Sequence, residues 1–446
     1  MSGGGSSIAL ATGLSAYPLR VAKIRTSDRS AFKRCRRKWD WSYSARHNRD
    51  ANESRAPFWT GTGFHFALED FHAHKVYPTA ADAFQAYSDA WAALMKSRDA
   101  PDIRMLERAD WDEQLHLAKS MLSYYQDNWL EMGRDELETF YWKGKPQVEV
   151  RFEIEIPLDP GYVAACGYDK VVYQGTIDRV MVDEYGRLWV VEYKTAKRFE
   201  TGHFDTDSQI TAYCWACEII YDMPFAGIVY QQHKKVVTQE PKWLETRNMY
   251  SVAQSQATTY SLYRKALEKT YGKVINAPTA NIQYLNNLAH LETNFRDDFV
   301  RRDYITRNRH QIWSVERDIM LEAADMINPK LPIYKNPTRD CSWDCSFQMM
   351  CVMKDDGSDW VSEMEMSTID REEVGDKWRK YLPKPQRLLT SPEQSPEDLE
   401  MAELLGELPP DPSHLLRAEP QVLLVPREQV LLTGPQILQR EVVRRS

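Results

Sequence analysis

The sequence lacks a long hydrophobic run and a secretory leader. None of its apolar stretches approaches the roughly 18 residues that a membrane-spanning helix needs. The first residues, Met1 to Ser7, are rich in Gly and Ser and lack the positively charged and apolar segments of a signal peptide. We therefore expect a soluble protein that remains in the cytoplasm.

The sequence also lacks an excess of positive charge and a paired set of cysteines. Its formal net charge of −8 argues against indiscriminate coating of nucleic acid but allows a local basic channel. The chain has seven cysteines, an odd number, and no leader, and this pattern does not indicate a disulfide framework. Metal or cluster ligation is then the alternative to simple burial of these thiols.

The hydrophobic pattern predicts a mixed α/β core between helical regions. Hydrophobic residues form 43% of the chain, enough to bury a sizeable core. Apolar periodicity is helical up to about Thr139, alternates as in strands up to about Val237, and is helical again up to Pro329. The predicted units are a disordered arm (1–22), a helical region (23–140), the α/β core (141–240), a second helical region (241–330), a cysteine loop (331–360) and an extension with a largely disordered tail (361–446).

Within this core, Gln147–Ile156 alternates apolar with charged residues, as a half-buried strand does. Thr176–Val182 and Leu188–Tyr193 alternate in the same way, and the turn-forming segment before Arg187 joins them into a hairpin. The other predicted elements are a helix and a short strand, Ser208–Tyr221 and Phe225–Tyr230.

The predicted hairpin gathers two carboxylates and a lysine. Asp178 lies on its first strand, and Glu192 and Lys194 share one face of the second. Carboxylate oxygens suit Mg²⁺ or Mn²⁺, and a lysine beside them can orient or deprotonate an attacking water. Such a set would hydrolyse a phosphodiester, although each residue alone is more often a solvated charge on a strand.

These residues carry a resemblance to a known family. Gly175-Thr-Ile-Asp178 followed by Val191-Glu192-Tyr-Lys194-Thr195 resembles the core motif of the PD-(D/E)xK nuclease superfamily. Gln209-Ile-Thr-Ala-Tyr213 is similar to the QxxxY motif of its RecB-like branch, and the segment around His65 resembles the helix that carries that branch's metal-binding histidine. The resemblance to RecB, AddB, CRISPR-associated RecB-type and bacteriophage exonucleases covers roughly Thr26 to Trp360.

The resemblance implies a restriction-endonuclease-like mixed sheet flanked by helices, and a site for Mg²⁺ or Mn²⁺. It assigns the metal to His65, Asp178, Glu192 and the backbone carbonyl of Tyr193, with Lys194 serving the water. It assigns the positioning of the lysine or water to Gln209 and the DNA contact to Tyr213, the two residues of the QxxxY motif. Without these motifs, the simpler interpretation of His65 would be a buried histidine whose ring nitrogens are hydrogen-bonded within the protein.

Three cysteines lie close together in sequence, Cys341, Cys345 and Cys351, and Cys35 lies far before them. Thiolates suit an iron-sulfur cluster or Zn²⁺, and spacing alone does not separate the two. The set resembles the [4Fe-4S] cysteines of AddB-type and CRISPR-associated nucleases, so the resemblance favours iron-sulfur and a helical lobe stapled by it. This chain has three residues between its second and third cysteine, where many relatives have two.

The other cysteines are predicted to be buried and apolar. Cys214-Trp-Ala-Cys217 has the spacing of a redox pair but lies in mid-helix, whereas reactive pairs lie at helix N-termini that stabilise thiolates. Cys166 receives the same interpretation.

Two basic groups are candidates for DNA contact, although any single arginine is as readily a solvated charge. The first alternates with aromatic residues that could stack on bases: Arg34, Arg36, Arg37, Lys38, Trp39 and Trp41. The second is predicted to lie on one long helix: Arg296, Arg301, Arg302, Arg307, Arg309, His310 and Trp313. Lys234 and Lys235 are candidates to extend this surface.

The function expected from the resemblance is a metal-dependent exonuclease acting on DNA ends, single-stranded ones above all, in recombination, replication or repair. It would work in the cytoplasm of a bacterial or phage-infected cell. The alternatives are a non-catalytic DNA-binding subunit of a recombination complex and a zinc-stabilised structural protein. The C-terminal tail, with short apolar clusters such as Val422–Val425, is a candidate contact for a recombination or replication protein, although a solvated tail is the simpler reading.

Overall fold

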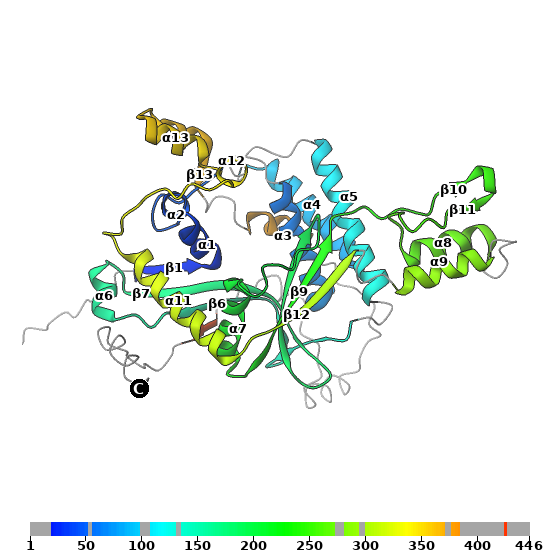
Figure 1. The fold of residues 1–446 in the computed structure, drawn as a ribbon, viewed down its shortest axis with the longest axis horizontal. Helices are drawn as coiled ribbons and strands as arrows, with labels where there is room; N and C mark the ends of the chain where they lie inside the picture. The colour runs from blue at the N-terminus through cyan, green and yellow to red at the C-terminus, as the bar shows by residue number, and fades with distance from the viewer. Residues whose placement is uncertain are drawn as a thin grey trace, which may run out of the picture.

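A mixed β-sheet forms the centre of the molecule in the computed structural model (Figure 1). The structure describes residues 19–51, 56–98, 108–130, 135–272, 281–293, 299–370, 376–383 and 423–425. The expected mixed α/β core between helices is confirmed, whereas the proposed unit boundaries stay predictions.

The sheet has the strand order β12-β9-β8-β7-β6-β14. Strands β6 (Val148–Glu155), β7 (Lys170–Val182) and β8 (Leu188–Ala196) form two consecutive antiparallel pairs, β6 with β7 and β7 with β8. Strand β9 (Phe225–Lys234) lies parallel to β8, and β12 (Val300–Thr306) lies antiparallel to β9. Three shorter strands join the sheet: β1 (Val21–Arg25) and β3 (Glu138–Thr139) on β7, and β14 (Leu423–Val425) on β6.

Helices cover both faces of the sheet. α7 (Ser208–Tyr221) begins where the Asp207 side chain accepts the amide protons of Gln209 and Ile210. It packs against α11 (Arg309–Ile327) and, with it, covers one face in a core that includes Val180, Val190 and Ile228. The opposite face, with Val191 and Val229, packs in a second core with α3 (Ala56–Glu69), α4 (Ala80–Met95) and α5 (Arg108–Tyr125).

The remaining elements complete the chain. α1 (Thr26–Arg34) and α2 (Arg36–Ser42) follow β1, and α8 (Tyr260–Tyr271) and α9 (Asn281–Thr293) form an arm that extends away from the sheet in Figure 1. The short elements are β2 (Arg49–Ala51), η1 (Asp70–His74), η2 (Gln126–Leu130), β4 (Tyr141–Trp142), β5 (Lys145–Pro146), α6 (Pro160–Ala165), β10 (Trp243–Leu244), η3 (Glu245–Arg247), β11 (Met249–Tyr250), α12 (Cys341–Asp344), α13 (Gln348–Asp356), α14 (Trp360–Ser367), β13 (Thr368–Asp370) and η6 (Asp376–Tyr381).

Several segments in the regions predicted as helical are strands, and the two longest are β1 and β12. β1 begins in the predicted disordered arm and continues into the first helical region, and β12 lies within the long helix that was predicted to carry Arg301 and Arg302. Both segments gain hydrogen bonds from a neighbouring strand, β7 or β9, which local periodicity cannot reveal. Most of the predicted disordered tail lies outside the described residues, but Leu423–Val425 pairs with β6. Within the described part of the chain, no helix has the length and apolar character needed to cross a membrane.

Candidate active site

The β7–β8 hairpin holds the predicted acidic residues. Arg179 pairs with Val191, which places Asp178 and Glu192 at adjacent positions of the two strands. Both carboxylates are buried, at 7% and 4% exposure. The Tyr193 amide donates a hydrogen bond to Asp178 Oδ2 at 2.7 Å. The hairpin therefore fixes one carboxylate against the backbone amide of Tyr193, the residue whose carbonyl was assigned to the metal.

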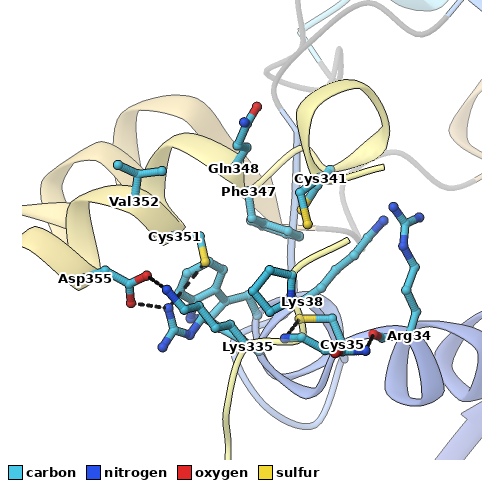
Figure 2. A pocket seen from close by; sticks show the side chains of 15 residues that line it. Arg34, Cys35, Lys38, Lys335, Cys341, Phe347, Gln348, Cys351, Val352 and Asp355 are labelled. Atoms are coloured by element: carbon cyan, nitrogen blue, oxygen red, sulfur yellow. Dashed lines mark hydrogen bonds and ion pairs between the residues drawn. The ribbon is translucent and has the colours of Figure 1, made fainter. Parts of the chain in front are cut away.

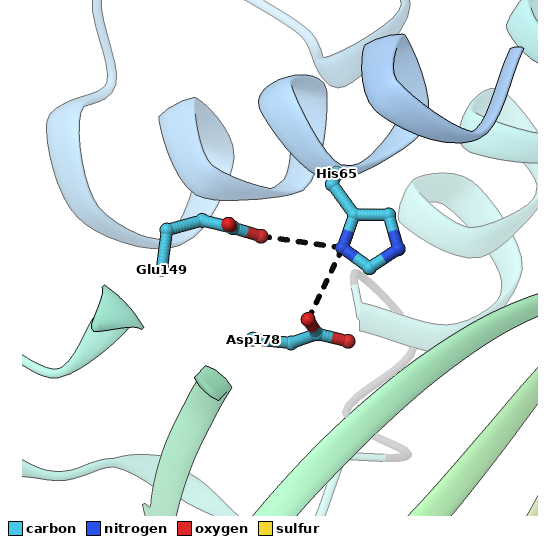
Figure 3. Close-up of side chains that lie close together, drawn as sticks. All are labelled: His65, Glu149 and Asp178. Carbon is cyan, nitrogen blue, oxygen red and sulfur yellow. Dashed lines mark hydrogen bonds and ion pairs between the residues drawn. The ribbon is translucent and has the colours of Figure 1, made fainter. Parts of the chain in front are cut away.

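His65 reaches this hairpin from α3. Its Nδ1 lies 3.3 Å from Asp178 Oδ1 and 3.2 Å from Glu149 Oε1 (Figure 3). One ligand atom from each of these three residues lies within 4.8 Å of the others. Burial opposes a charged imidazole, but the carboxylates of Asp178 and Glu149 outweigh it and hold the pKa of His65 well above its usual value. An imidazole nitrogen and carboxylate oxygens at this spacing can hold a divalent cation.

Glu149 is the site residue that the sequence analysis missed. It lies across from Asp178, because the neighbouring pairs in the β6–β7 ladder are Val148 with Arg179 and Val150 with Ile177. Its φ of 48° is in the left-handed region that residues other than glycine seldom adopt. Burial raises the pKa of Glu149, although His65 opposes the shift. In the sequence it is one of several alternating charges, so no local signal distinguished it from a solvated strand residue.

A hydrogen-bonded chain continues from Glu192 to α7. Lys194 Nζ and Gln209 Nε2 both donate to Glu192 Oε1, the second at 3.2 Å. Gln209 Nε2 also lies 3.3 Å from the Tyr213 hydroxyl, one helical turn along α7. Burial and the charge of Asp178 raise the pKa of Glu192 to about 7, whereas Lys194 opposes the shift. Gln209 of the QxxxY motif therefore contacts the glutamate of the E-x-K motif directly, and Tyr213 is linked to that glutamate through Gln209.

These side chains open into one cavity of about 790 Å³. It is lined by all of the predicted side-chain site residues: His65, Asp178, Glu192, Lys194, Gln209 and Tyr213. The Tyr193 side chain points elsewhere and accepts a hydrogen bond from Arg179 Nη1 at 3.3 Å. The structure thus brings the predicted set together around a space that a substrate can enter.

The four candidate cluster cysteines line a second cavity, of about 180 Å³ (Figure 2). Cys35 lies between α1 and α2, and the others lie on or beside α12 and α13. Three of their sulfurs accept hydrogen bonds: Cys351 Sγ from Arg37 Nη1 at 3.3 Å, Cys35 Sγ from the Asn336 amide and Cys341 Sγ from the Thr338 amide, both at 3.4 Å. Segments about 300 residues apart in sequence therefore meet around these thiols.

The first basic group does not form the predicted stacking surface. Trp39 and Trp41 are buried, at 0% and 2% exposure, because they pack into two separate apolar clusters. Arg34 pairs with Asp344, and Arg37 pairs with Asp355 at 2.9 Å. Two further cations hold neighbouring groups: Arg36 pairs with Asp325 on α11, and Lys38 donates to the Asp344 carbonyl. These cations therefore join α1 and α2 to the cysteine segment and to α11.

The second basic group is divided between a strand, a loop and a helix, so the prediction of one helix is wrong. The Arg302 side chain is 3% exposed and pairs with Asp135 at 2.7 Å. Arg307 is buried and donates to Thr211 Oγ1 at 2.8 Å. Arg296 lies outside the described residues. The remaining members have other surroundings: Arg301 pairs with Asp303, Arg309 pairs with Glu218, His310 and Trp313 are exposed on α11, and Lys234 and Lys235 are half-buried at the end of β9.

The remaining cysteines are largely as predicted. Cys214 and Cys217 are fully buried in α7, and burial raises the pKa of both thiols. Cys166 is only half-buried, at the end of α6. Glu69, one helical turn beyond His65 on α3, pairs with His74 and Arg379.

The geometry agrees with a comparison of the sequence with known families. Residues 26–352 match the family model of the PD-(D/E)XK nuclease superfamily. No curated protein sequence matches the chain. The matched segment is most of the chain and contains β6 to β9, α3, α7 and every residue of the cavity described above except Arg25 and Arg379. The chain therefore belongs to the PD-(D/E)XK nuclease superfamily.

Proposed function

We propose that this protein is a metal-dependent DNA exonuclease of the RecB-like branch, which hydrolyses phosphodiester bonds from DNA ends in recombination, replication or repair. The observation that carries the proposal is the convergence of His65 and Asp178 with the Glu192–Lys194–Gln209 chain in one cavity. Membership of the superfamily supports nuclease chemistry. The histidine on α3 and the contact between Gln209 and Tyr213 support the RecB-like branch.

The residues present suit Mg²⁺ or Mn²⁺. His65, Glu149 and Asp178 offer one imidazole nitrogen and two carboxylates, and Glu192 adds a third carboxylate next to Asp178. A cation bound there would neutralise charge on the phosphoryl oxygens and acidify a water. The Tyr193 amide keeps Asp178 oriented, and Gln209 keeps Glu192 oriented. Lys194 lies beside Glu192 at the cavity wall, where its ammonium can orient the attacking water.

We also propose that Cys35, Cys341, Cys345 and Cys351 hold a [4Fe-4S] cluster. All four face one cavity, and backbone or arginine N–H groups already point at three of the sulfurs, an arrangement that suits thiolates. Thiolates suit either an iron-sulfur cluster or Zn²⁺. The resemblance of the four cysteines to those of AddB-type and CRISPR-associated nucleases supports the iron-sulfur cluster.

A non-catalytic DNA-binding subunit is the rival function. Such a subunit, which would serve only as a platform for DNA, has no chemical need for Asp178, Glu192 and Lys194 together. All three are present and lie next to one another. Metal analysis that finds zinc and no iron would favour the other alternative, a zinc-stabilised structural protein. A recombination or replication partner that binds the C-terminal tail stays a prediction.

The test uses anaerobically purified protein with end-labelled linear and circular DNA, each single- and double-stranded, with and without Mg²⁺ or Mn²⁺. We expect linear DNA to be shortened only with the metal, whereas circles stay intact. Asp178→Asn protein prepared in parallel controls for a contaminating nuclease. Equal degradation of circles would contradict end-directed action, and DNA binding without cleavage would favour the platform.

A further inference from the structure

Three arginines from three separate segments line the catalytic cavity, and none belongs to either basic group predicted from the sequence. Arg25 lies at the end of β1, Arg151 lies on β6 and Arg379 lies on η6. Arg25 is exposed, and Arg151 and Arg379 are half-buried. Their guanidinium groups therefore share one accessible space with the proposed metal site.

Arg379 comes from a distant part of the chain. Its neighbour Trp378 is 1% exposed and packs edge-on against Phe66 and Tyr87, with ring centroids 5.2 and 4.6 Å away. Arg379 Nη2 lies 3.4 Å from Glu69 Oε2, and its guanidinium lies over the Phe66 ring. Trp378 thus anchors η6 on α4 and on α3, the helix that carries His65, and fixes Arg379 at the cavity wall.

The charge of the cavity explains why such arginines are needed. Four carboxylates line it, from Glu149, Glu153, Asp178 and Glu192. A bound cation would neutralise charge only where the ligands converge, so the phosphates on either side of the cleaved bond would meet an acidic wall. A planar guanidinium can bind two oxygens of one phosphate, which makes arginine the residue suited to that place.

We propose that Arg25, Arg151 and Arg379 form a phosphate track that holds the backbone of a nucleic-acid strand beside the cleaved bond. The proposal rests on the proposed nuclease function and names the residues that bind its substrate. The three segments that carry the arginines lie around one cavity, so the strand would contact all of them while one phosphate reaches the metal site. Arg379 would bind phosphate from its present position beside Glu69.

The number of phosphates bound is measurable as a salt dependence. Binding of a fluorescein-labelled single-stranded oligonucleotide is followed by anisotropy in Ca²⁺ over a range of KCl concentrations, with a gel to check that the DNA stays intact. Each of Arg25→Gln, Arg151→Gln and Arg379→Gln should lower the slope of log affinity against log salt by about 0.7, the value for one phosphate contact on a single strand. Arg379→Lys should keep the slope, because the charge remains.

Arg264→Gln is the matched control. Arg264 is a 55% exposed arginine that pairs with Glu268, belongs to neither basic group and is not part of the cavity wall. Thermal unfolding of every variant checks that a changed slope does not come from misfolding. Wild-type protein that cleaves DNA while all three variants keep the slope of Arg264→Gln would overturn the track alone. Wild-type protein that neither binds nor cleaves DNA would overturn the proposed function and the track together.

Discussion

Glu149 and Asp178 face each other across β6 and β7, and both carboxylates contact the same atom, His65 Nδ1, at 3.2 and 3.3 Å. Like charges opposite each other destabilise a sheet, so this pair needs a positive partner between them. The imidazole of His65 supplies a positive charge there, and a divalent cation would supply more. The left-handed backbone of Glu149 adds strain of the kind that persists at functional sites.

Glu149→Gln should therefore lower Mn²⁺ affinity by at least about tenfold, since even an outer partner of a metal ligand contributes that much. Isothermal titration calorimetry with Mn²⁺ measures this without DNA. Glu153→Gln is the matched control, because Glu153 lies on the same strand but pairs with Lys23 at 2.7 Å. Equal affinities in the two variants would remove Glu149 from the metal site.

Substitution of the predicted metal ligands, Asp178 and Glu192, should affect metal binding, whereas substitution of Lys194 should affect only the rate of cleavage. Asp178→Ala or Glu192→Ala should abolish cleavage and weaken Mn²⁺ binding while leaving DNA binding largely intact, because neither carboxylate replaces the other. Lys194→Ala should bind the metal but lose about 10²–10⁴ in rate, as expected for a lost acid, base or water-orienting group. Single-turnover rates at saturating Mn²⁺ decide this, and an unchanged rate for Lys194→Ala would exclude its role.

Local patterns were sufficient for the hairpin and for α7. The bounds predicted for α7, Ser208 to Tyr221, are those observed, because its start depends on the adjacent cap Asp207 and its hydrophobic residues lie within the same segment. Asp178 and Glu192 were also placed correctly, since a short turn fixes the pairing of the two strands. Both depend on contacts between residues close in sequence.

Features that depend on distant contacts could not be predicted in this way. Trp39 looked like an exposed stacking residue, but it packs between Phe32 and Tyr43 at ring distances of 5.0 and 5.3 Å. Arg302 looked like a DNA contact, but Asp135, which lies 167 residues earlier in the chain, pairs with it. Arg379 was part of a segment taken for an extension, and its position depends on the burial of the adjacent Trp378. In each case the partner, rather than the residue's own neighbours, determines the environment.

The glycines of α3 offer a test of how the helix positions His65. A Cβ on Gly63 would lie 2.5 Å from Tyr87 Cε1 and 2.6 Å from Phe84 Cε2, whereas one on Gly61 would meet nothing within 4 Å. Tyr87 cannot easily move, because it is buried and its hydroxyl donates to the Trp59 carbonyl at 2.9 Å.

Gly63→Ala should therefore destabilise the protein by about 1–3 kcal/mol, the usual cost of overpacking, and weaken Mn²⁺ binding by displacing His65. Gly61→Ala should be neutral or up to about 1 kcal/mol more stable, because alanine favours helix. Denaturant unfolding and Mn²⁺ titration measure both effects. Equal stability of the two variants would show that α3 has room to shift.

The proposed cluster should act as a staple between Cys35 and the C-terminal cysteines. Cys35→Ser or Cys341→Ser should lose the brown colour, the iron and the inorganic sulfide, and should lower stability, because metal-binding free energy contributes to folding. Cys214→Ser should keep the cluster, since that thiol lies in the core of α7. Iron content unchanged in the first two variants would exclude the four-cysteine site.

Arg37 tests whether a hydrogen bond to a cysteine sulfur protects the proposed cluster. Its Nη1 donates to Cys351 Sγ and to Asp355, so Arg37→Gln should keep the iron but make the cluster easier to lose in air. The decay of visible absorbance under oxygen measures this, with Arg309→Gln as the control. Equal decay would show that the contact with the sulfur does not protect the cluster.

Trp378 determines where the C-terminal part of the chain becomes dispensable. A chain that ends at Pro385 keeps Trp378, whereas a chain that ends at Asp370 loses it. Both shortened chains lack β14, so the loss of β14 does not contribute to a difference between them. Loss of a buried tryptophan costs about 3–5 kcal/mol. Trp378 packs on Phe66, next to His65, so its loss should also loosen the metal site.

We therefore expect the chain ending at Pro385 to cleave DNA like the full-length protein and to lose only the small part of the melting temperature that the pairing of β14 with β6 contributes. The chain ending at Asp370 should melt at a lower temperature and bind Mn²⁺ more weakly. Trp378→Ala in the full-length protein should reproduce both losses, because it removes the anchor and leaves the rest of the chain in place. If Trp378→Ala keeps the full-length melting temperature and Mn²⁺ affinity, then η6 does not support α3, and the position of Arg379 in the cavity must depend on its contact with Glu69 alone.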